Sequence, residues 1–348
     1  MSPFTRTLLF LALGIGTCTT LTSSHWLLAW MGLEISTLAI APLMTHNHHP
    51  RSVEATTKYF LAQAAAAAML LFASITNAWI SGQWELQLMS HPLPTSMIII
   101  AIALKIGLAP MHAWLPDVLQ GLDLTTGLIL STWQKLAPFA ILVQISPSNP
   151  ALLISMGLIS TLVGGWGGLN QTQLRKILAY SSIAHLGWMI LVLQFSPPLA
   201  LLALFTYLAM TFSTFSAFKL ANATTMNKLA TSWSKAPLLA ILLPFILLSL
   251  GGLPPLTGFA PKWFILQELA KQGLPLTATF AALTALLSLY FYLRVSYAMT
   301  LTISPSTLPN LAPWRLSSPQ TALPLATSAV IATCLLPITP LALALSAA

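Results

Sequence analysis

Five ionisable residues lie inside long apolar stretches of this 348-residue sequence: Glu34, Lys105, Lys135, His185 and Lys262. At the centre of a bilayer a charged side chain costs about 2.5–3.5 kcal/mol on insertion scales, so the glutamate and the three lysines together cost on the order of 10 kcal/mol before any pairing. Ionisable groups at this depth are rare and are usually functional. We therefore interpret these residues as a functional site.

The chemistry that suits this set of residues is proton transfer. A buried lysine releases its proton readily when its surroundings change, and an imidazole can pass a proton on near neutral pH. His185 follows the hydroxyl residues Ser181 and Ser182 by about one helical turn. One carboxylate cannot neutralise three lysines, so at least two of the cations need water or a titrating partner. The pattern therefore predicts a proton relay through all five residues.

A structural role is the alternative for each of these residues. The glutamate and the lysines could form buried ion pairs that fix helix registry, and His185 could be a hydrogen-bonded core residue. Snorkelling to the membrane surface suits Lys219, Lys271 and Arg294, which lie near the ends of apolar runs. It suits the central residues poorly, because one carboxylate cannot pair with three lysines, and Glu34 itself lies about half a bilayer from either face.

Two apolar runs are interrupted by glycine and proline. Lys105 lies about one turn before the first interruption, which contains Gly107 and Pro110. In the second, Gly251–Lys262, three prolines and three glycines precede Lys262. The backbone groups that proline frees are tolerated in a membrane only beside protein or a water-filled cavity. Paired broken helices in two halves of a chain predict inverted repeats with an ion site at the midplane, and ordinary proline kinks are the alternative.

The composition points to a lipid environment, because 56% of the residues are hydrophobic and only 6% are charged. Windows of about 20 apolar residues predict an all-α transmembrane bundle of about eleven helices, forming a single domain over 1–348. The predicted spans are Pro3–Thr22, His25–Met44, Thr57–Trp79, Thr95–Trp114, Leu124–Val143, Pro150–Asn170, Leu174–Leu193, Pro197–Leu220, Leu238–Leu269, Thr277–Ile303 and Ala322–Ser346. The ninth span could also form two half-helices. The net charge of +8 is scattered among these spans, so we expect no nucleic-acid binding.

Lysine and arginine residues gather in alternate connections between the spans. The connections after spans two, six, eight and ten hold Arg51 and Lys58, Arg175 and Lys176, Lys228 and Lys235, and Arg315, and Lys271 after span nine is the exception. By the positive-inside rule these connections and the N-terminal end lie on the cytoplasmic or matrix side, and an odd number of spans places the C-terminus on the opposite side. No connection is long enough for a flavin, nicotinamide or iron–sulfur module, and we expect no metal site.

Four motifs give the sequence a specific resemblance. They are 31–35 around Glu34, 105–118 beginning at Lys105, 171–185 ending at His185, and 251–262 ending at Lys262. In this order and over essentially the full length, the sequence resembles the antiporter-like membrane-arm subunits of mitochondrial NADH–ubiquinone oxidoreductase, the respiratory complex I of vertebrates. The resemblance implies a subunit of a proton-translocating enzyme that is related to cation/proton antiporters and carries no redox cofactor of its own.

The resemblance also implies roles and partners. Glu34 and Lys105 match the pair at which protons are taken up, Lys135 matches the central lysine and Lys262 the lysine on the exit side. FMN, iron–sulfur clusters and ubiquinone would belong to the complex as a whole. The implied partners are other membrane-arm subunits, including neighbouring antiporter-like chains, and lipids such as cardiolipin. The implied location is the mitochondrial inner membrane, with the N-terminus on the matrix side and the C-terminus on the intermembrane-space side.

Two other classes of function stay open from the sequence. A stand-alone cation/proton antiporter would use the same broken helices, but hard cations prefer carboxylate or carbonyl oxygens, and Glu34 is the one acid near mid-membrane. A structural membrane scaffold would need no mid-membrane lysines. Sodium-dependent flux in liposomes would favour the antiporter, and full pumping after removal of all four charges would favour the scaffold.

Overall fold

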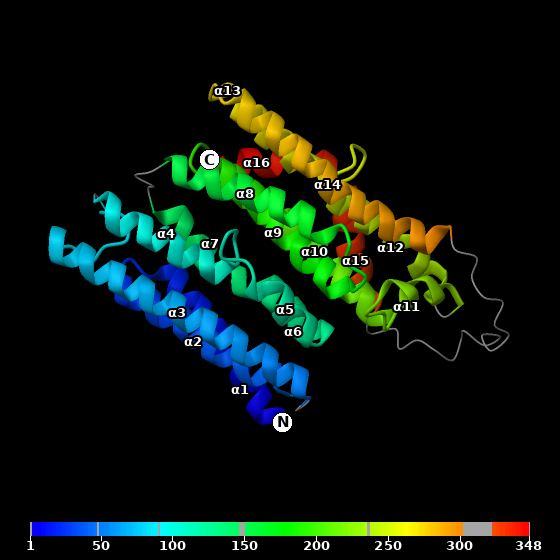
Figure 1. The fold of residues 1–348 in the computed structure, drawn as a ribbon, viewed down its shortest axis with the longest axis horizontal. Coiled ribbons are helices and arrows are strands. Elements are labelled where there is room, and N and C mark those ends of the chain that lie inside the picture. Colours follow the sequence, from blue (N-terminus) through cyan, green and yellow to red (C-terminus); the bar gives the residue numbers. More distant parts are fainter. Residues whose placement is uncertain are drawn as a thin grey trace. The chain divides into compact units, whose positions relative to one another are not determined.

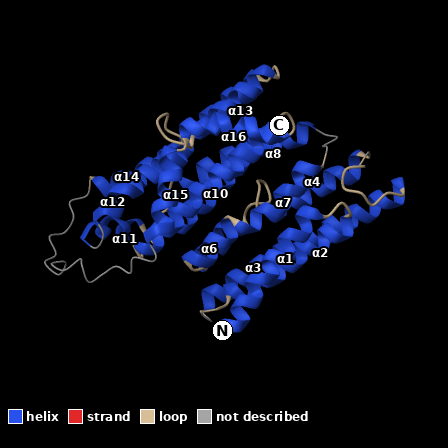
Figure 2. Cartoon of the chain, turned by 180° about the vertical axis from the view of Figure 1, so that it is seen from behind, coloured by secondary structure: helices blue, strands red, loops and turns tan. Residues whose placement is uncertain are grey.

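Helices form all the regular structure in the part of the chain that the structure describes. The structure is a computed structural model and describes residues 2–46, 49–89, 91–145, 150–234, 237–301 and 322–347. No strand occurs in these ranges (Figure 2), where two isolated bridges, His25 to Glu85 and Gln173 to Thr225, join connecting segments. The predicted all-α class is therefore confirmed, as expected of a chain whose backbone must satisfy its own hydrogen bonds in lipid.

Figure 1 shows the helices of the described ranges. In chain order they are α1 (Pro3–Thr22), α2 (Trp26–Met44), α3 (Pro50–Ser81), α4 (Pro92–Ile106), α5 (Trp114–Gly121), α6 (Leu124–Ser131), α7 (Trp133–Gln144), α8 (Pro150–Gly168), α9 (Leu174–Leu193), α10 (Pro197–Leu220), α11 (Met226–Ala230), η1 (Thr231–Ser234), α12 (Pro237–Gly251), α13 (Phe259–Lys271), α14 (Pro275–Thr300), α15 (Ala322–Cys334), η5 (Leu336–Ile338) and α16 (Thr339–Ala347). Lys235 and Arg315, two of the predicted topology markers, lie outside the described residues.

Local residue chemistry sets several helix starts. Proline occupies the first turn of α1, α3, α4, α10 and α14, where its missing N–H is not needed. His25, His49 and His91 each precede a helix and accept a hydrogen bond through Nδ1 from the backbone N–H two residues on, at 3.2, 3.2 and 3.4 Å. These side chains satisfy N–H groups that the first helical turn leaves without a backbone partner.

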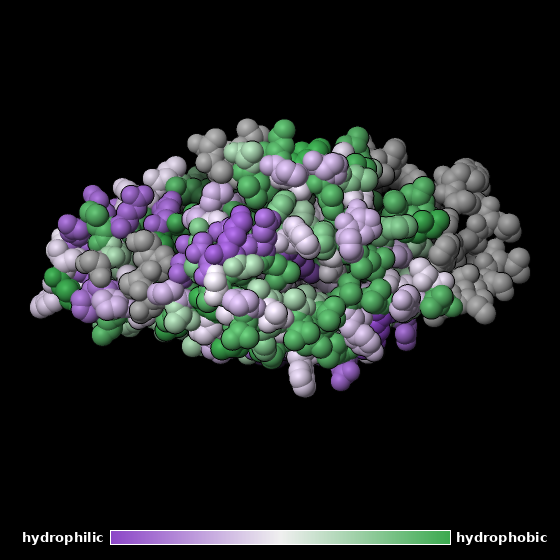
Figure 3. Space-filling view, turned by 90° about the horizontal axis from the view of Figure 1, so that it is seen from above, coloured by the Kyte–Doolittle hydropathy of each residue, from purple (hydrophilic) through white to green (hydrophobic). Residues whose placement is uncertain are grey.

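The predicted membrane spans agree with the observed helices. Eight helical segments of the described ranges, with α6 and α7 counted together as Leu124–Gln144, are long and apolar enough to cross a membrane. Shorter apolar helices occupy Pro92–Ile106, Leu238–Gly251 and Leu323–Cys334. Large hydrophobic side chains face outward, among them Trp79 and Leu276, which are 89% and 83% exposed. Figure 3 shows such hydrophobic residues over much of one face, with hydrophilic side chains gathered in patches. This surface suits lipid as the solvent.

The main differences between the predicted and the observed helix boundaries lie in the third, fourth, fifth and last spans. The third span is longer, at Pro50–Ser81, and the fourth helix ends at Ile106. The ninth span divides into the half-helices α12 and α13, as anticipated. The fifth divides unexpectedly at Thr132, whose N–H and hydroxyl both bond to the Leu128 carbonyl, an arrangement that bends a helix. The last span divides between α15 and α16. The short 3-10 helix η5 lies between them and contains Pro337.

The chain forms two compact units, Met1–Met156 and Gly157–Ala348. In the first unit α1 packs on α2, α3 packs on α2, α4 and α5, and α7 contacts α1, α2 and α4. In the second unit α10 packs against α9, α12, α13, α15 and α16, and α14 packs on α12. Each unit contains one of the two predicted broken helices. The organisation as one functional domain over 1–348 stays a prediction.

Candidate functional site

The two predicted breaks have the same backbone turn. At the end of α4 the amides of Gly107 and of the next residue both bond to the Ala103 carbonyl at 2.9 Å. At the end of α12 the amides of Gly252 and of the next residue bond to the Leu248 carbonyl at 3.1 and 3.4 Å. Gly107 and Gly252 have φ values of +85° and +81°, which favour glycine. Each half-helix therefore ends with free carbonyl groups next to an ionisable side chain.

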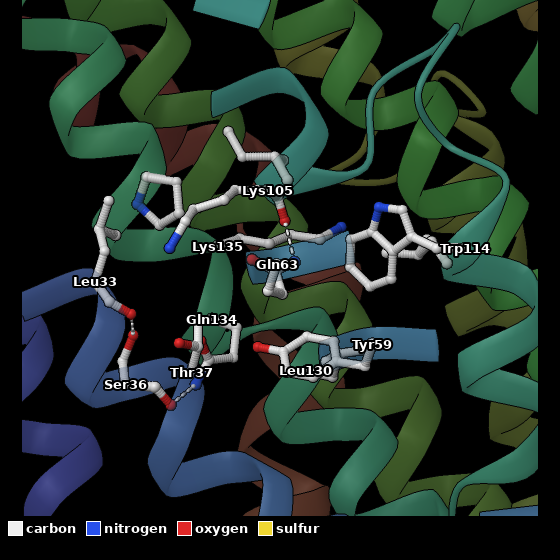
Figure 4. Close-up of a pocket in the computed structure, with 13 residues that line it drawn as sticks. Leu33, Ser36, Thr37, Tyr59, Gln63, Lys105, Trp114, Leu130, Gln134 and Lys135 are labelled. Carbon is white, nitrogen blue, oxygen red and sulfur yellow. Dashed lines mark hydrogen bonds between the residues drawn. The ribbon is translucent and has the colours of Figure 1, made fainter. Parts of the chain in front are cut away.

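In the first unit, Lys105 and Lys135 line one small enclosed cavity (Figure 4). The cavity leaves about 10 Å³ for the centre of a water molecule, about the space of a single water. Its lining residues come from α2, α3, α4, α5, α6 and α7: Leu33, Ser36, Thr37, Tyr59, Gln63, Lys105, Ile106, Trp114, Leu115, Leu130, Gln134, Lys135 and Pro138. Both lysine side chains are buried, at 5% and 2% exposure. Two buried lysines around one water-sized space can pass a proton through that space when one is an ammonium and the other a neutral amine.

The end of α4 is held by side chains from neighbouring segments. The buried amide of Gln63, from α3, donates to the Lys105 carbonyl at 3.1 Å, shown as a dashed line in Figure 4. The indole N–H of Trp114 donates to the Leu104 carbonyl at 3.0 Å, and its ring meets the ring of Tyr59 edge-on at 5.8 Å between centroids. These two bonds satisfy carbonyls that a continuous helix would pair internally.

Glu34 lies near this cavity without touching Lys105. The side chain is half-buried on α2, and its carboxylate is close enough to interact electrostatically with Lys105 and Tyr59. No ion pair within 4 Å joins it to Lys105 among the described residues. The buried Oε2 of Glu34 and Nζ of Lys105 both lack a hydrogen-bond partner in that part of the chain. The predicted pair is thus two neighbouring ionisable groups that interact electrostatically and form no ion pair within 4 Å.

Lys135 lies next to the break that the sequence prediction missed. It is the third residue of α7, one turn after Thr132, and the next turn contains Pro138. The adjacent Gln134 donates to the Ser36 carbonyl of α2 at 3.3 Å, which ties the start of α7 to the helix that carries Glu34. The cavity therefore has a broken helix on two sides.

In the second unit, His185 and Lys262 lie on helices that pack together. His185 is buried near the centre of α9, and its ring lies 5.5 Å from the ring of Tyr207 on α10, measured between centroids. Lys262, near the start of α13, donates through Nζ to the Gly251 carbonyl at 2.8 Å. Helix α13 packs against both α9 and α10. The Lys262 side chain therefore holds the free end of α12.

The site contains residues that sequence reasoning did not identify. Gln63, Tyr59, Trp114 and Gln134 line the cavity and fix the broken ends around it. A signal for Gln63 was present, because it is a polar residue inside the alanine-rich run of α3. An uncharged polar residue inside a membrane span is usually bonded to a neighbouring helix.

The fold and the site define an antiporter-like membrane protein, and comparison with known families agrees. Residues 23–288 match the family described as NADH:quinone oxidoreductase/Mrp antiporter, TM, and residues 289–343 match the NADH dehydrogenase subunit 2 C-terminus. A subunit of respiratory complex I from Thermus thermophilus has the same fold, with a TM-score of 0.89 and 29% identity over 99% of this chain and 80% of that chain. An Mrp complex chain from Dietzia sp., 17% identical, shares the fold with a TM-score of 0.81 over 97% of this chain and 74% of its own.

The sequence relatives are more specific. The chain is 69% identical to NADH-ubiquinone oxidoreductase chain 2 of Tetraodon nigroviridis and 67% identical to that of Salmo salar, in each case over 98% of both chains. It is 68% identical to the same protein of Gadus morhua over 99% of both chains. The chain belongs to the NADH-ubiquinone oxidoreductase chain 2 family.

Proposed function

We propose that this chain is a membrane subunit of the proton-pumping NADH:ubiquinone oxidoreductase, respiratory complex I, and that it carries protons across the membrane while electrons pass from NADH to ubiquinone elsewhere in the complex. The observation that carries the proposal is the Lys105–Lys135 cavity with the Glu34 charge beside it. The names of its relatives indicate the enzyme to which we assign the chain, NADH:ubiquinone oxidoreductase. The described residues form apolar helices, so we assign the proton path to this chain and the redox chemistry to other subunits of the complex.

The proposed relay begins with Glu34 and Lys105. A charge change in a neighbouring subunit alters the electrostatic interaction between the two groups. When the carboxylate no longer favours the ammonium, Lys105 releases its proton toward Lys135 across their shared cavity. The path continues in the second unit through His185 to Lys262.

The transfer must be gated to be useful. Moving one charge fully across 100 mV costs about 2.3 kcal/mol, so a permanently open path would let protons flow back. The small cavity fits a gate, because its space of about 10 Å³ holds about one water rather than a continuous file. Small shifts of Glu34 or of the broken ends would then connect or interrupt the path.

The finer features of the assembly form part of the same proposal. We infer that the chain lies in the mitochondrial inner membrane, with its N-terminus in the matrix and its C-terminus facing the intermembrane space. Its partners are other membrane-arm subunits, including neighbouring antiporter-like chains, and lipids such as cardiolipin. FMN, the iron–sulfur clusters and ubiquinone are bound elsewhere in the complex.

The test removes the four charges in the assembled complex. A complex with Glu34→Gln, Lys105→Met, Lys135→Met and Lys262→Met is reconstituted in proteoliposomes, and NADH oxidation and proton uptake are measured together. The proposal expects fewer protons translocated per NADH, because the path through this chain is lost. An unchanged ratio would favour the scaffold, and sodium-dependent flux by the unsubstituted chain in liposomes would favour a stand-alone antiporter.

A further inference from the structure

Glu34 is the acid of the proposed relay, but it does not line the cavity that Lys105 and Lys135 share (the lysine cavity). Three neighbours of Glu34 on α2 line it instead: Leu33, Ser36 and Thr37. The Oε2 atom of Glu34 is buried and has no hydrogen-bond partner among the described residues. Its carboxylate interacts electrostatically with Lys105 and with Tyr59, which both line the cavity. A proton on Glu34 therefore needs a side chain that connects the carboxyl group to the cavity.

Hydroxyl groups are the neutral side chains suited to this connection, because one oxygen atom can both accept and donate a proton. Ser36, Thr37 and Tyr59 bring hydroxyl groups to the cavity wall. Ser36 donates its hydrogen to the Leu33 carbonyl at 2.8 Å, and Thr37 donates to the Glu34 carbonyl at 2.9 Å. No described residue forms a hydrogen bond with the Tyr59 hydroxyl group. Of these three hydroxyl groups, that of Tyr59 therefore has a hydrogen available for transfer.

The position of Tyr59 is fixed without the use of its hydroxyl group. Its side chain is buried, and its ring meets the ring of Trp114 edge-on at 5.8 Å between centroids. The preceding residue, Lys58, forms an ion pair with Asp117 of α5 at 3.3 Å, so two successive residues of α3 are held against α5. Figure 4 shows the Tyr59 ring on the Trp114 side of the cavity, with its hydroxyl group directed toward the Gln134 side. The hydroxyl group thus points into the cavity.

We propose that Tyr59 is a further proton-carrying residue of the relay, and that its hydroxyl group passes protons between the Glu34 carboxyl group and the lysine cavity. The inference rests on the proposed function of that cavity. When Glu34 is protonated, its O–H bond breaks and the proton bonds to the Tyr59 oxygen. The original O–H bond of Tyr59 breaks in the same step. Its proton goes to a neutral lysine amine, directly or through the single water that the cavity has room for.

This exchange leaves Tyr59 neutral before and after each transfer, while Glu34 becomes a carboxylate and the amine becomes an ammonium. A buried phenolate beside a carboxylate is thereby avoided, and its formation would carry a high desolvation cost. The hydroxyl group must rotate back about its C–O bond before it can pass the next proton. The connection therefore carries one proton at a time, as a gated path requires.

The experiment compares unsubstituted complexes with Tyr59→Phe and Tyr290→Phe complexes in proteoliposomes. Phenylalanine keeps the ring and removes the hydroxyl group, and assembly should be intact because that group has no hydrogen-bond partner among the described residues. Tyr290→Phe is the matched control, because it removes the hydroxyl group of a tyrosine that is 59% exposed on α14. We expect NADH-driven proton pumping per assembled complex to fall about tenfold in Tyr59→Phe, which corresponds to about 1.4 kcal/mol of barrier. Tyr290→Phe should pump normally.

A double variant tests whether Glu34 acts through Tyr59. Residues that serve one transfer step are not additive, whereas independent residues are. We expect Glu34→Gln combined with Tyr59→Phe to pump about as fast as the slower of the two single variants. A loss equal to the product of the two single losses would show that the residues act independently, and this outcome overturns the inference.

A merely structural role of Tyr59 predicts a different result. If the ring only packs against Trp114, Tyr59→Phe keeps that contact and pumps normally, and this outcome overturns the inference. A solvent-isotope measurement adds a readout that packing does not change. Slow proton transfer in Tyr59→Phe should raise the ratio of the pumping rates in H₂O and D₂O above that of the unsubstituted complex. Slow pumping with an unchanged ratio also counts against the inference.

A parallel measurement on Lys105→Met separates the inference from the proposed function. Normal pumping in Lys105→Met refutes the proposed function and the inference with it. Lost pumping in Lys105→Met together with normal pumping in Tyr59→Phe refutes the inference alone.

Discussion

Substitution of Lys105 by methionine and by arginine separates a proton relay from a salt bridge that only fixes helix registry. Methionine keeps the length of the side chain and removes the titrating group. Arginine keeps the charge, but its guanidinium does not release a proton in proteins. A relay predicts that both variants assemble and that both lose coupled pumping. A registry salt bridge predicts that arginine preserves function and that methionine harms assembly.

The structure sets the magnitude of the assembly effect. Breaking a direct buried ion pair costs about 3–5 kcal/mol. Lys105 and Glu34 form no ion pair within 4 Å. At an effective dielectric constant of about 20, two unit charges attract by about 4 kcal/mol at 4 Å and by less at a larger separation. Methionine also removes the desolvation cost of a buried ammonium that lacks a hydrogen-bond partner. We therefore expect Lys105→Met to destabilise the subunit by less than about 2 kcal/mol.

Arginine has a different cost, because it adds two heavy atoms beside a cavity with space for about one water. Overpacking of this kind costs about 1–3 kcal/mol, which still permits assembly. The assay measures complex abundance on native gels, NADH-driven ubiquinone reduction and proton translocation in proteoliposomes. Normal pumping in Lys105→Arg would refute the relay role of Lys105. Failed assembly of Lys105→Met with an active Lys105→Arg would support the registry salt bridge.

Three further predictions concern the fold and the assembly. Gly252→Ala should destabilise the second unit by about 1–2 kcal/mol, because φ is +81° and the added Cβ would lie 3.0 Å from Lys262 Cδ; unchanged thermal stability and pumping would contradict this. Cysteine labelling should place the connections at Arg51 and Arg175 in the matrix and the Ser346 end on the opposite side, and a shared side for Arg175 and Ser346 would refute the topology. The purified chain alone should oxidise no NADH and bind no flavin or iron–sulfur cluster, so a stoichiometric chromophore would be evidence against the cofactor assignment.

The sequence was sufficient for the helical class, the approximate positions of the spans and the two main breaks. These features are local: a span needs a long enough apolar run, and Gly107, Gly252 and the nearby prolines act on the backbone within one or two turns. The sequence also identified Lys105, Lys135 and Lys262 as candidate functional residues. A charged side chain inside an apolar span has a high free-energy cost that depends little on its particular neighbours, so the sequence alone indicates that such a residue has a role.

Tertiary structure decided how these residues are used. The break at Thr132, the bond from Gln63 to the Lys105 carbonyl and the separation between Glu34 and Lys105 all depend on contacts between helices distant in the chain. Helix periodicity gives the face of a side chain but not the partner across the interface, because that partner is selected by packing of whole helices. The sequence by itself therefore determined which charges enter the membrane, and only the folded chain determined which carbonyls and cavity meet them.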